Sequence, residues 1–541
     1  MTIAEKIQTI FPRVIDIPEH LLKDIPFIQA GYLINGELRV WDGPRQQVFS
    51  PVWVTNNTDP EPFLIGEYPL LTEAHALEAL DAAVVAYDHG RGLWPTLQVA
   101  DRIDHMERFV FRMIEVKEQV VRFLMWEVGK SFQDSTKEFD RTVKYINDTL
   151  AALKDLDRTS SRFAIEEDII GQIRRAPLGV VLSMGPFNYP LNETFTTLIP
   201  ALVMGNTVIL KPPKHGALLY APLLEAFCQV FPKGVINIVY GEGRKMIPPL
   251  MASGKINVLG LIGTSKTANA LKKQHPHPNR LRCVLGLEAK NPAIVLNGAD
   301  LDLAVKECVS GCLSFNGQRC TALKILFVQA DIVDVFLEKF VAAVNALTFG
   351  MPWQEGVVIT PVAEKNKTDY LAALVSDAVE LGANIVNSSG AMVCGSFFFP
   401  AILYPANPEM RIYHEEQFGP VIPVLSFKNV SEPVDYMIHS NYGQQVSIFG
   451  TNPDQIASLI DPLVNQVCRV NINSQCQRGP DTFPFTGRKD SAEGTLSVSD
   501  ALRVFSIRTL VAAKQTDLNK KIITGIVRDR KSKFLATDFI L

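Results

Sequence analysis

The chain has 541 residues, which at roughly 150 residues per domain corresponds to three or four structural units. Hydrophobic residues make up 47% of the chain and charged residues 20%, a composition that excludes a disordered scaffold. The net charge of −4 excludes a global basic excess for nucleic acid or an anionic membrane, so any anion recognition must be local.

The cysteines and the apolar segments predict where the chain is found. None of the eight cysteines belongs to a CxxC pair or to a Cys/His cluster with zinc spacing, so no metal site is expected. Cys308 and Cys312 are interpreted as buried thiols of one helix. No apolar stretch approaches the ~18 residues that span a bilayer, and the N-terminus lacks the features of a signal peptide. These patterns predict a cytoplasmic protein with no membrane or nucleic-acid partner.

The N-terminal part is expected to be irregular first and helical afterwards. Prolines at positions 12, 18, 26, 44 and 51 indicate an irregular extension over residues 1–60 that packs on the body. Residues 71–96 and 101–155 are expected to be helical. The second of these stretches carries one apolar face with spacings of three and four, made by Phe139, Val143, Ile146, Leu150 and Leu153.

From about residue 170 short apolar strands alternate with helices, a pattern typical of a parallel, doubly wound sheet. The expected strands are Leu178–Met184, Asn206–Leu210, Gly234–Tyr240 and Ile256–Ile262. A second alternation begins near residue 281 and predicts a second α/β domain of about 200 residues. It consists of strands at 282–286, 292–297 and 323–329, with helices at 302–315 and 332–347. The basic C-terminal segment is interpreted as a solvated tail or a packed helix, with a nucleic-acid patch as the weaker alternative.

Two loops carry candidate catalytic groups. Cys320 ends the segment Gly-Gln-Arg-Cys, and a thiolate stabilised by a neighbouring cation can add to an aldehyde carbonyl. Asn188, in Gly-Pro-Phe-Asn-Tyr-Pro after an expected strand, can donate a hydrogen bond to a developing oxyanion. Taken alone, a structural cysteine and a turn asparagine are the favoured interpretations of these two residues.

Two further loops follow expected strands at the edge where a nucleotide binds in such sheets. Lys211-Pro-Pro-Lys214 follows one strand. Gly263-Thr264-Ser265 follows another and opens a helix whose N–H groups suit a pyrophosphate. Plain strand-to-helix turns remain the alternative for both. The G-x-G-x-x-G fingerprint is absent, because Met246 takes its last position.

Together with Glu-Gln-Phe-Gly-Pro at 416–420 and Pro-Phe-Thr-Gly-Arg-Lys-Asp-Ser at 484–491, these motifs resemble the aldehyde dehydrogenase superfamily over about residues 70–515. The resemblance implies two doubly wound α/β domains with a bridging β-hairpin arm that builds dimers or tetramers. The implied units are an extension at 1–60, a coenzyme-binding domain at 61–155 and 177–280, an oligomerisation arm at 156–176 and 500–515, a catalytic domain at 281–499 and a tail at 516–541.

The resemblance also implies roles for single residues. Cys320 is the expected nucleophile, and Asn188 with the backbone N–H of Cys320 is expected to hold the oxyanion. The expected cofactor-binding residues are Lys211 on the adenosine ribose, Thr264 at the pyrophosphate, Glu416 on the nicotinamide ribose and Phe418 beside it. Lys214 takes a position where relatives that use NAD commonly have glutamate. Its positive charge favours the 2′-phosphate of NADP, so NADP is the expected cofactor and NAD is the alternative.

Within the superfamily, the chain is similar to the branch of non-phosphorylating glyceraldehyde-3-phosphate dehydrogenases. The segment Arg478-Gly-Pro-Asp-x-Phe-Pro-Phe is close to that branch's signature. With Arg141, Tyr189 and Arg319 it implies a site for the phosphate of the substrate. Structural ion pairs of Arg141 and Arg478 are the alternative. The implied reaction oxidises glyceraldehyde 3-phosphate to its acid, with water as the acyl acceptor.

The chain departs from the family at the general base. The family has Glu-Leu-Gly-Gly-Lys, whereas this chain reads Gly286-Leu-Glu288-Ala-Lys290, so Gly286 takes the position of the base. Glu288 lies two residues later and is interpreted either as a substitute base or as a structural carboxylate. Two other functions stay open: a dehydrogenase that transfers the acyl group to coenzyme A, and a catalytically silent protein that binds NADP.

Overall fold

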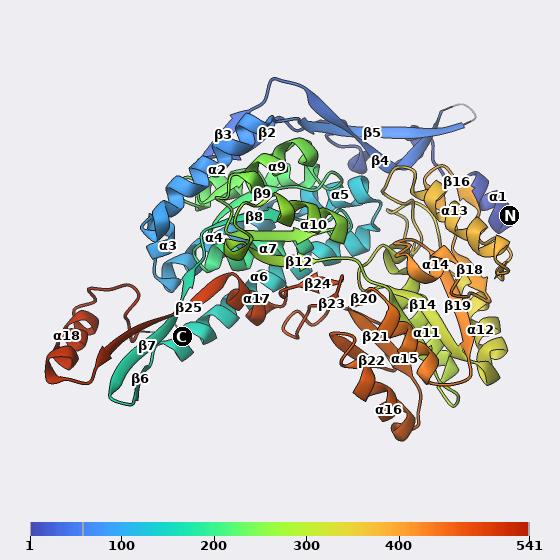
Figure 1. Cartoon of the computed structure of the whole chain (residues 1–541). Coiled ribbons are helices and arrows are strands. Elements are labelled where there is room, and N and C mark those ends of the chain that lie inside the picture. Colours follow the sequence, from blue (N-terminus) through green and yellow to red (C-terminus); the bar gives the residue numbers. More distant parts are fainter. Residues whose placement is uncertain (1, 57–58, 539–541) are drawn as a thin grey trace.

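The computed structural model describes residues 2–56 and 59–538. It consists of two α/β bodies that lie side by side and a β-arm that extends from the first body (Figure 1). The doubly wound α/β architecture predicted from the sequence is therefore confirmed. No helix among the described residues is long and apolar enough to span a membrane.

The first body is built on an eight-stranded sheet with the order β24-β12-β11-β8-β9-β10-β2-β3. Its five central strands run parallel. Strand β8 has β9 on one side and β11 on the other, so the chain changes direction there and opens a crevice at the carboxyl ends of the strands. The central strands are β8 (Val180–Met184), β9 (Thr207–Lys211), β10 (Ile236–Ile238), β11 (Val258–Ile262) and β12 (Arg282–Gly286).

The first 60 residues differ from the expected irregular extension. Strands β2 (Gly31–Ile34) and β3 (Glu37–Val40) extend the first sheet, because β2 pairs antiparallel with β10. Strands β4 (Arg45–Asn56) and β5 (Asp59–Pro69) form a long hairpin, to which β1 (Phe27–Ile28) adds. The prolines misled the prediction because sheet edges and bulges tolerate them, and Pro51 lies where the β4–β5 register shifts.

The β4–β5 hairpin also joins the two bodies. The hydroxyl of Ser50 donates to the carbonyl of Trp126 in the first body, 2.7 Å away, and the hydroxyl of Ser396 in the second body donates to the carbonyl of Pro51. Figure 1 shows the hairpin running along the top of both bodies.

Helices cover the first sheet, and α2 and α7 both pack on β8 and β9. The two helical stretches predicted before residue 155 are broken into shorter helices. Gly129 ends α5 with a left-handed φ of 67°, and Ser131 then caps α6. The helices of this body are α2 (Glu73–Tyr87), α3 (Leu93–Thr96), α4 (Val99–Glu115), α5 (Lys117–Val128), α6 (Phe132–Ser160), α7 (Asn192–Val203), α8 (Leu224–Val230), α9 (Gly243–Ala252) and α10 (Ser265–Gln274).

The second body is built on a seven-stranded sheet with the order β15-β18-β19-β14-β13-β21-β22. It begins at β13, because β12 pairs with β11 and belongs to the first sheet. The expected start of the second domain at residue 281 is corrected accordingly, since an apolar strand does not reveal by itself which sheet it joins. The strands are β13 (Asn291–Val295), β14 (Leu323–Gln329), β15 (Asn384–Ile385), β18 (Ala401–Tyr404), β19 (Val421–Phe427), β21 (Gln445–Phe449) and β22 (Arg469–Ile472).

Most of the remaining helices and strands belong to the second body, and one late strand returns to the first sheet. Cys308 and Cys312 are buried on α11, as the sequence predicted. Strand β24 (Ala492–Glu493) returns to the first sheet and pairs with β12. The helices are α11 (Leu301–Leu313), α12 (Val333–Asn345), α13 (Lys367–Glu380), α14 (Arg411–His414), α15 (Ser431–His439), α16 (Pro453–Leu463) and α17 (Val498–Val504), with α1 (Ile3–Gln8) at the start; the short strands are β16 (Val393–Cys394), β17 (Phe397–Phe398), β20 (Tyr442–Gly443) and β23 (Arg488–Lys489).

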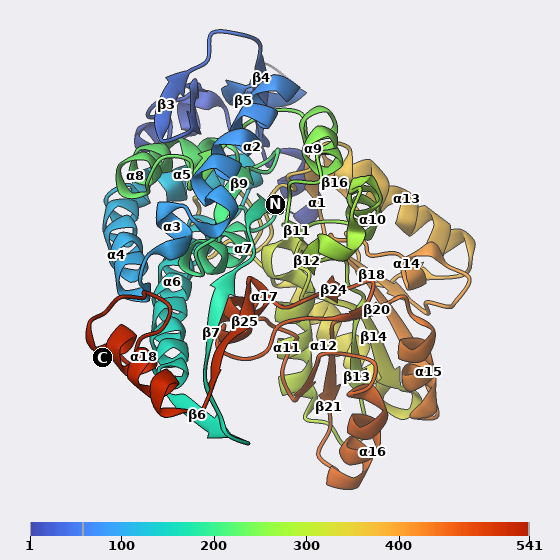
Figure 2. The same cartoon turned by 60° about the vertical axis from the view of Figure 1, so that its left-hand side comes forward.

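The arm is a three-stranded antiparallel sheet of β6 (Phe163–Glu166), β7 (Ile169–Pro177) and β25 (Ser506–Lys514). It lies beside the long helix α6 in Figure 2, and α18 (Asp517–Arg528) follows it. The segment after α18 folds back, and Ala536 exchanges hydrogen bonds with Gln172 of β7. The arm exposes the apolar side chains of Ile165, Ile169, Ile173, Ile507, Leu510 and Val511.

One fully buried ion pair connects α6 to the loop after β8. The ammonium of Lys130 pairs with Glu138 of α6, and neither side chain is exposed to solvent. Lys130 also donates to the carbonyl of Asn188, 2.8 Å away, while Glu138 accepts the N–H groups of Leu191 and Asn192 at 3.1 Å. The pair therefore fixes the position of this loop.

Replacing Lys130 by methionine is expected to destabilise the fold by about 3–5 kcal/mol, because Glu138 would keep a buried charge without its partner. The measurement is the urea midpoint of unfolding. The control is Lys144→Met, which removes an exposed pair with Asp148 and should change stability by less than about 1 kcal/mol. Equal midpoints for both variants would contradict this role of the pair.

Candidate active site

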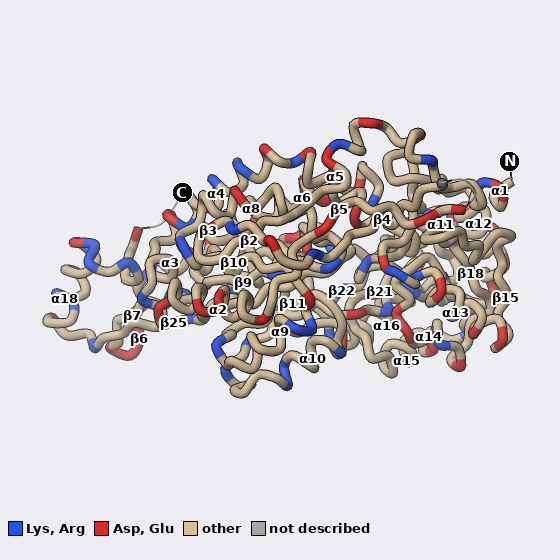
Figure 3. The backbone as a smooth tube through the Cα atoms, turned by 90° about the horizontal axis from the view of Figure 1, so that it is seen from above, with Lys and Arg blue, Asp and Glu red and all other residues tan. Residues whose placement is uncertain are grey.

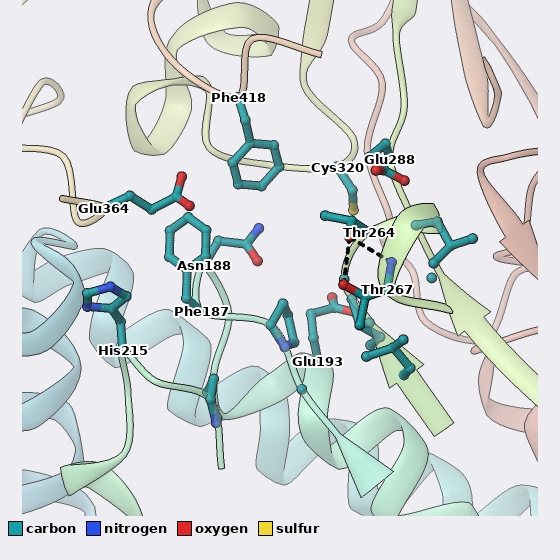
Figure 4. A pocket seen from close by; sticks show the side chains of 18 of the residues that line it. Phe187, Asn188, Glu193, His215, Thr264, Thr267, Glu288, Cys320, Glu364 and Phe418 are labelled. Atoms are coloured by element: carbon teal, nitrogen blue, oxygen red, sulfur yellow. Dashed lines mark hydrogen bonds between the residues drawn. The ribbon is translucent and has the colours of Figure 1, made fainter. Parts of the chain in front are cut away.

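A cavity of about 860 Å³ opens at the carboxyl ends of β8, β9 and β11. The second body closes it from the other side with Cys320, Glu416 and Phe418. Figure 4 labels lining residues from both bodies, among them Asn188 of the first and Cys320 and Phe418 of the second. All eight residues predicted to act in catalysis or cofactor binding line the cavity: Asn188, Lys211, Lys214, Thr264, Glu288, Cys320, Glu416 and Phe418.

Cys320 follows a strained turn that the backbone preferences of its residues do not predict. Three successive residues, Phe315, Asn316 and Gly317, have left-handed φ values of 49°, 55° and 70°. The buried Asn316 is held by Thr360, whose N–H donates to the Asn316 amide oxygen at 2.9 Å. A side chain at Gly317 would meet the carbonyl oxygen of Cys312 at 2.7 Å, so only glycine fits. The turn thus fixes the direction in which Cys320 enters the cavity.

The surroundings of Cys320 change the pKa of its thiol. Burial raises the pKa of its thiol, and the negative charge of Glu193 raises it further, against the cations Lys324 and Arg478. The structure gives the N–H of Cys320 no hydrogen-bond partner among the described residues. Asn188 donates one amide hydrogen bond to the carbonyl of Gln318 at 2.9 Å, which brings it beside the turn that carries Cys320.

Two lysines line the cavity, Lys211 at the end of β9 and Lys214 three residues later. Burial and the charge of Lys214 lower the pKa of Lys211 to about 8. Neither lysine forms an ion pair within the part of the chain that the structure describes. His215 adjoins them, and burial with the charge of Lys214 lowers its pKa to about 4. This corner can accept an anion. Lysine, arginine and acidic residues are otherwise spread along the whole molecule (Figure 3).

Helix α10 begins at the same cavity. The side chain of Thr264 caps it by accepting the N–H of Thr267 at 3.2 Å. The Glu288 carboxylate accepts the N–H of Ser265 at 2.7 Å, so this candidate base is engaged at the helix N-terminus. Gly286 lies in β12 and offers no functional group to the cavity.

The other wall is fixed by contacts in the second body. Glu416 pairs with the buried Lys324 and accepts the N–H of Ala289 at 3.1 Å. Phe418, at a left-handed φ of 46°, meets the ring of Phe187 edge-on with 5.8 Å between centroids. These contacts hold Glu416 and Phe418 at the mouth of the cavity.

The arginines predicted to bind a phosphate lie behind this cavity, and two of them are paired. Arg141 makes two hydrogen bonds to Asp481 at 2.7 and 2.9 Å. Arg478 is 4% exposed and bonds to Asp481 at 3.0 Å and to Glu193. The structure therefore shows the ion pairs that the sequence left as the alternative for Arg141 and Arg478.

The other two residues of that predicted site have free polar groups. Arg319 donates to the carbonyl of Gly311 at 3.0 Å, but its buried Nε atom has no partner among the described residues. Tyr189 is close enough for Arg319 and Arg141 to lower the pKa of its hydroxyl, although burial raises that pKa overall.

Sequence reasoning missed Glu193, His215, Glu364 and Tyr442, which also line the cavity. For Glu193 a signal existed. It is the only charged residue of α7, and all twelve residues of that helix are buried. A carboxylate inside such a helix indicates a functional or paired group.

The comparisons with known proteins agree with this geometry. Residues 53–511 match the model of the aldehyde dehydrogenase family. Since this range covers most of the chain, the protein belongs to the aldehyde dehydrogenase family, and the predicted resemblance is confirmed.

Its relatives include enzymes with different substrates. An NADP-dependent glyceraldehyde-3-phosphate dehydrogenase of Streptococcus equinus is 31% identical over 458 residues, which cover 84% of this chain and 92% of that protein. A malonate-semialdehyde dehydrogenase of Listeria monocytogenes is 28% identical over 476 residues, which cover 85% and 96%. The crystal structure of the NADP-dependent glyceraldehyde-3-phosphate dehydrogenase from Bacillus halodurans C-125 with NADP has a TM-score of 0.82 at 30% identity, covering 90% of this chain and all of that one.

The raised pKa of Cys320 predicts its reactivity. The rate of alkylation by iodoacetamide should rise with pH through a midpoint above that of an ordinary thiol, because the thiolate is the reacting form. Quantifying the modified Cys320 peptide by mass spectrometry gives this profile without interference from the other cysteines. A midpoint below that of an ordinary thiol would show that the neighbouring cations dominate over burial.

Proposed function

We propose that the protein oxidises an aldehyde to its carboxylic acid with NADP through a thioester on Cys320. The observation that carries this proposal is the cavity itself, which Cys320 and Asn188 line together with Lys211 and Lys214, two lysines that form no ion pair among the described residues. The Cys320 thiolate forms a bond to the aldehyde carbon, and the N–H groups of Asn188 and Cys320 hold the resulting oxyanion. A bound nicotinamide would accept the hydride that leaves this carbon. Water then displaces the Cys320 thiolate and releases the acid.

Residues that line this cavity fit an NADP molecule. Lys211 and Lys214 supply charge for a 2′-phosphate, and Glu416 can accept hydrogen bonds from ribose hydroxyls. The N-terminus of α10 suits a pyrophosphate, which would compete with Glu288 for the N–H of Ser265. The names of the relatives from Streptococcus and Bacillus support the same cofactor.

Replacing Lys214 by glutamate is expected to raise the KM for NADP by about 10- to 100-fold, because a charge-assisted contact of ~1.5–3 kcal/mol is lost. The KM for NAD should stay constant or fall. Initial rates with both cofactors measure the change. The matched control is Lys233→Glu, an exposed reversal of charge outside the cavity. An unchanged ratio of the two KM values would remove Lys214 from the cofactor site.

As the substrate we propose glyceraldehyde 3-phosphate. The names of the relatives support it, and so do the free Nε atom of Arg319 and the hydroxyl of Tyr189, because a phosphate oxygen accepts from such donors. Arg141 and Arg478 join this site only when they exchange Asp481 or Glu193 for the phosphate.

The test follows reduction of NADP at 340 nm without phosphate or CoA. We expect kcat/KM for glyceraldehyde 3-phosphate to exceed that for unphosphorylated glyceraldehyde by at least about tenfold. Cys320→Ala should abolish turnover, and Arg319→Gln should raise the KM of the phosphorylated substrate only. Equal kcat/KM values for both aldehydes would assign the enzyme another substrate.

One observation favours a second acyl acceptor. Gly286 has no base to offer, and Glu288 is bound to Ser265, so transfer of the acyl group to CoA is the alternative. Strict dependence of product formation on CoA would identify it. A catalytically silent protein would bind NADP without any burst.

We also propose that the arm mediates self-association as a dimer or tetramer. Its exposed apolar side chains and the free edge of β25 support this, because another chain can cover such an edge. A cytoplasmic location stays a prediction from the sequence.

A further inference from the structure

Hydrolysis of a thioester needs a group that takes a proton from water, and the usual position for it holds Gly286. Five carboxylates line the cavity: Glu193, Glu288, Glu364, Glu415 and Glu416. The structure allows each of them to be examined for this role.

Four of these carboxylates are occupied elsewhere. Glu288 is bound to the N–H of Ser265, and Glu416 is paired with Lys324. Glu415 is paired with Arg411 and accepts the hydroxyl of Tyr370 at 3.0 Å. Glu364 pairs with Lys367 at 3.2 Å, and in Figure 4 it lies on the far side of Phe187 from Cys320.

Glu193 differs from the other four in its relation to Cys320. It is the second residue of α7, five positions after the oxyanion residue Asn188, and it comes from the same side of the pocket. Its charge raises the pKa of the Cys320 thiol more than any other charged group does. The field of Glu193 therefore reaches the atom that carries the acyl group.

The contacts of Glu193 leave one oxygen free. Its Oε2 atom pairs with Arg478, which compensates the charge of a side chain that is only 8% exposed. No described residue forms a hydrogen bond with Oε1. Arg478 does not need Glu193 to be satisfied, since it also binds Asp481 at 3.0 Å and the carbonyl of Leu496 at 3.0 Å.

We propose that Glu193 is the general base that hydrolyses the acyl-enzyme, an assignment that rests on the proposed function of Cys320. Oε1 of Glu193 takes a proton from a water molecule while the water oxygen forms a bond to the thioester carbon. The carbon–sulfur bond then breaks, the thiolate of Cys320 leaves with the electron pair, and the acid is released. The proton on Glu193 passes to that thiolate or to solvent, which restores the starting state.

The test uses p-nitrophenyl acetate, which acylates a cysteine thiolate without cofactor or aldehyde. The full-length protein is expected to release one p-nitrophenolate per site in a burst and then to turn over steadily. In Glu193→Gln the burst should persist, while the steady rate falls by about 100-fold or more, because general bases contribute 10²- to 10⁴-fold. The acetyl adduct on Cys320 should accumulate in this variant by mass spectrometry.

Three further variants separate a base from a structural carboxylate. Glu193→Asp should recover part of the steady rate, and the exposed matched control Glu225→Gln should behave like the unmodified protein. A purely structural role for Glu193 would reduce the burst and the steady rate together, and that result would overturn the proposal. A stall in Glu288→Gln with steady turnover in Glu193→Gln would move the base to Glu288.

The outcomes for the unmodified protein also separate this proposal from the proposed function. A burst followed by a stall would overturn the role of Glu193 and leave CoA as the acceptor. A burst with equal steady rates in the protein and Glu193→Gln would overturn only the role of Glu193. Absence of any burst would overturn both assignments, because Cys320 would then form no acyl-enzyme.

Discussion

The buried ion pair of Lys130 and Glu138 is the contact that positions the loop carrying Asn188 and the start of α7. The ammonium has no access to water and is surrounded by the carboxylate, the carbonyl of Asn188 and the rings of Tyr189 and Phe315 at 3.5 and 4.5 Å from their centroids. Because an uncompensated buried charge is costly, the loop that presents Asn188 has one favourable arrangement. The same carboxylate fixes the start of α7, so Asn188 and Glu193 are placed by a single interaction.

A second constraint is that the site exists only where the two bodies meet. Asn188 follows β8 of the first sheet, whereas Cys320 precedes β14 of the second. The hydrogen bond from Asn188 to Gln318 crosses between them, and the β4–β5 hairpin contacts both bodies. The strained turn before Cys320 is held from the same junction, because the carbonyl of Gly129 accepts the hydroxyl of Thr360, which in turn binds Asn316. The site is therefore complete only when the two bodies are docked.

The sequence predicted the parallel strands because short apolar runs bounded by turns have few other solutions, and β12 and β14 begin and end where expected. It placed β12 in the wrong body because pairing partners are not encoded in such a run. It predicted Cys320, Asn188 and both lysines as site residues because their motifs combine in the order of the family, and all four line one cavity. It missed Glu193, although this is the one charged residue of α7, because the burial that makes such a carboxylate informative is decided by tertiary packing. Likewise, a sequence cannot show that Arg141 and Arg478 share Asp481.

Compensating charges explain how the Glu193 carboxylate can line the same cavity as Cys320 without repelling an anionic substrate. Arg141 and Arg478, behind the cavity, are balanced by Asp481 and Glu193, whereas Lys211 and Lys214 line the cavity without an ion pair among the described residues. A phosphorylated aldehyde that binds Arg478 competes with Glu193 for the same guanidinium. Such an exchange would remove the partner of Oε2 of Glu193, and the phosphate would supply the negative charge that compensates Arg478. Under the roles proposed for Glu193 and Arg478, binding of the substrate phosphate would therefore be coupled to the ion pair of Glu193.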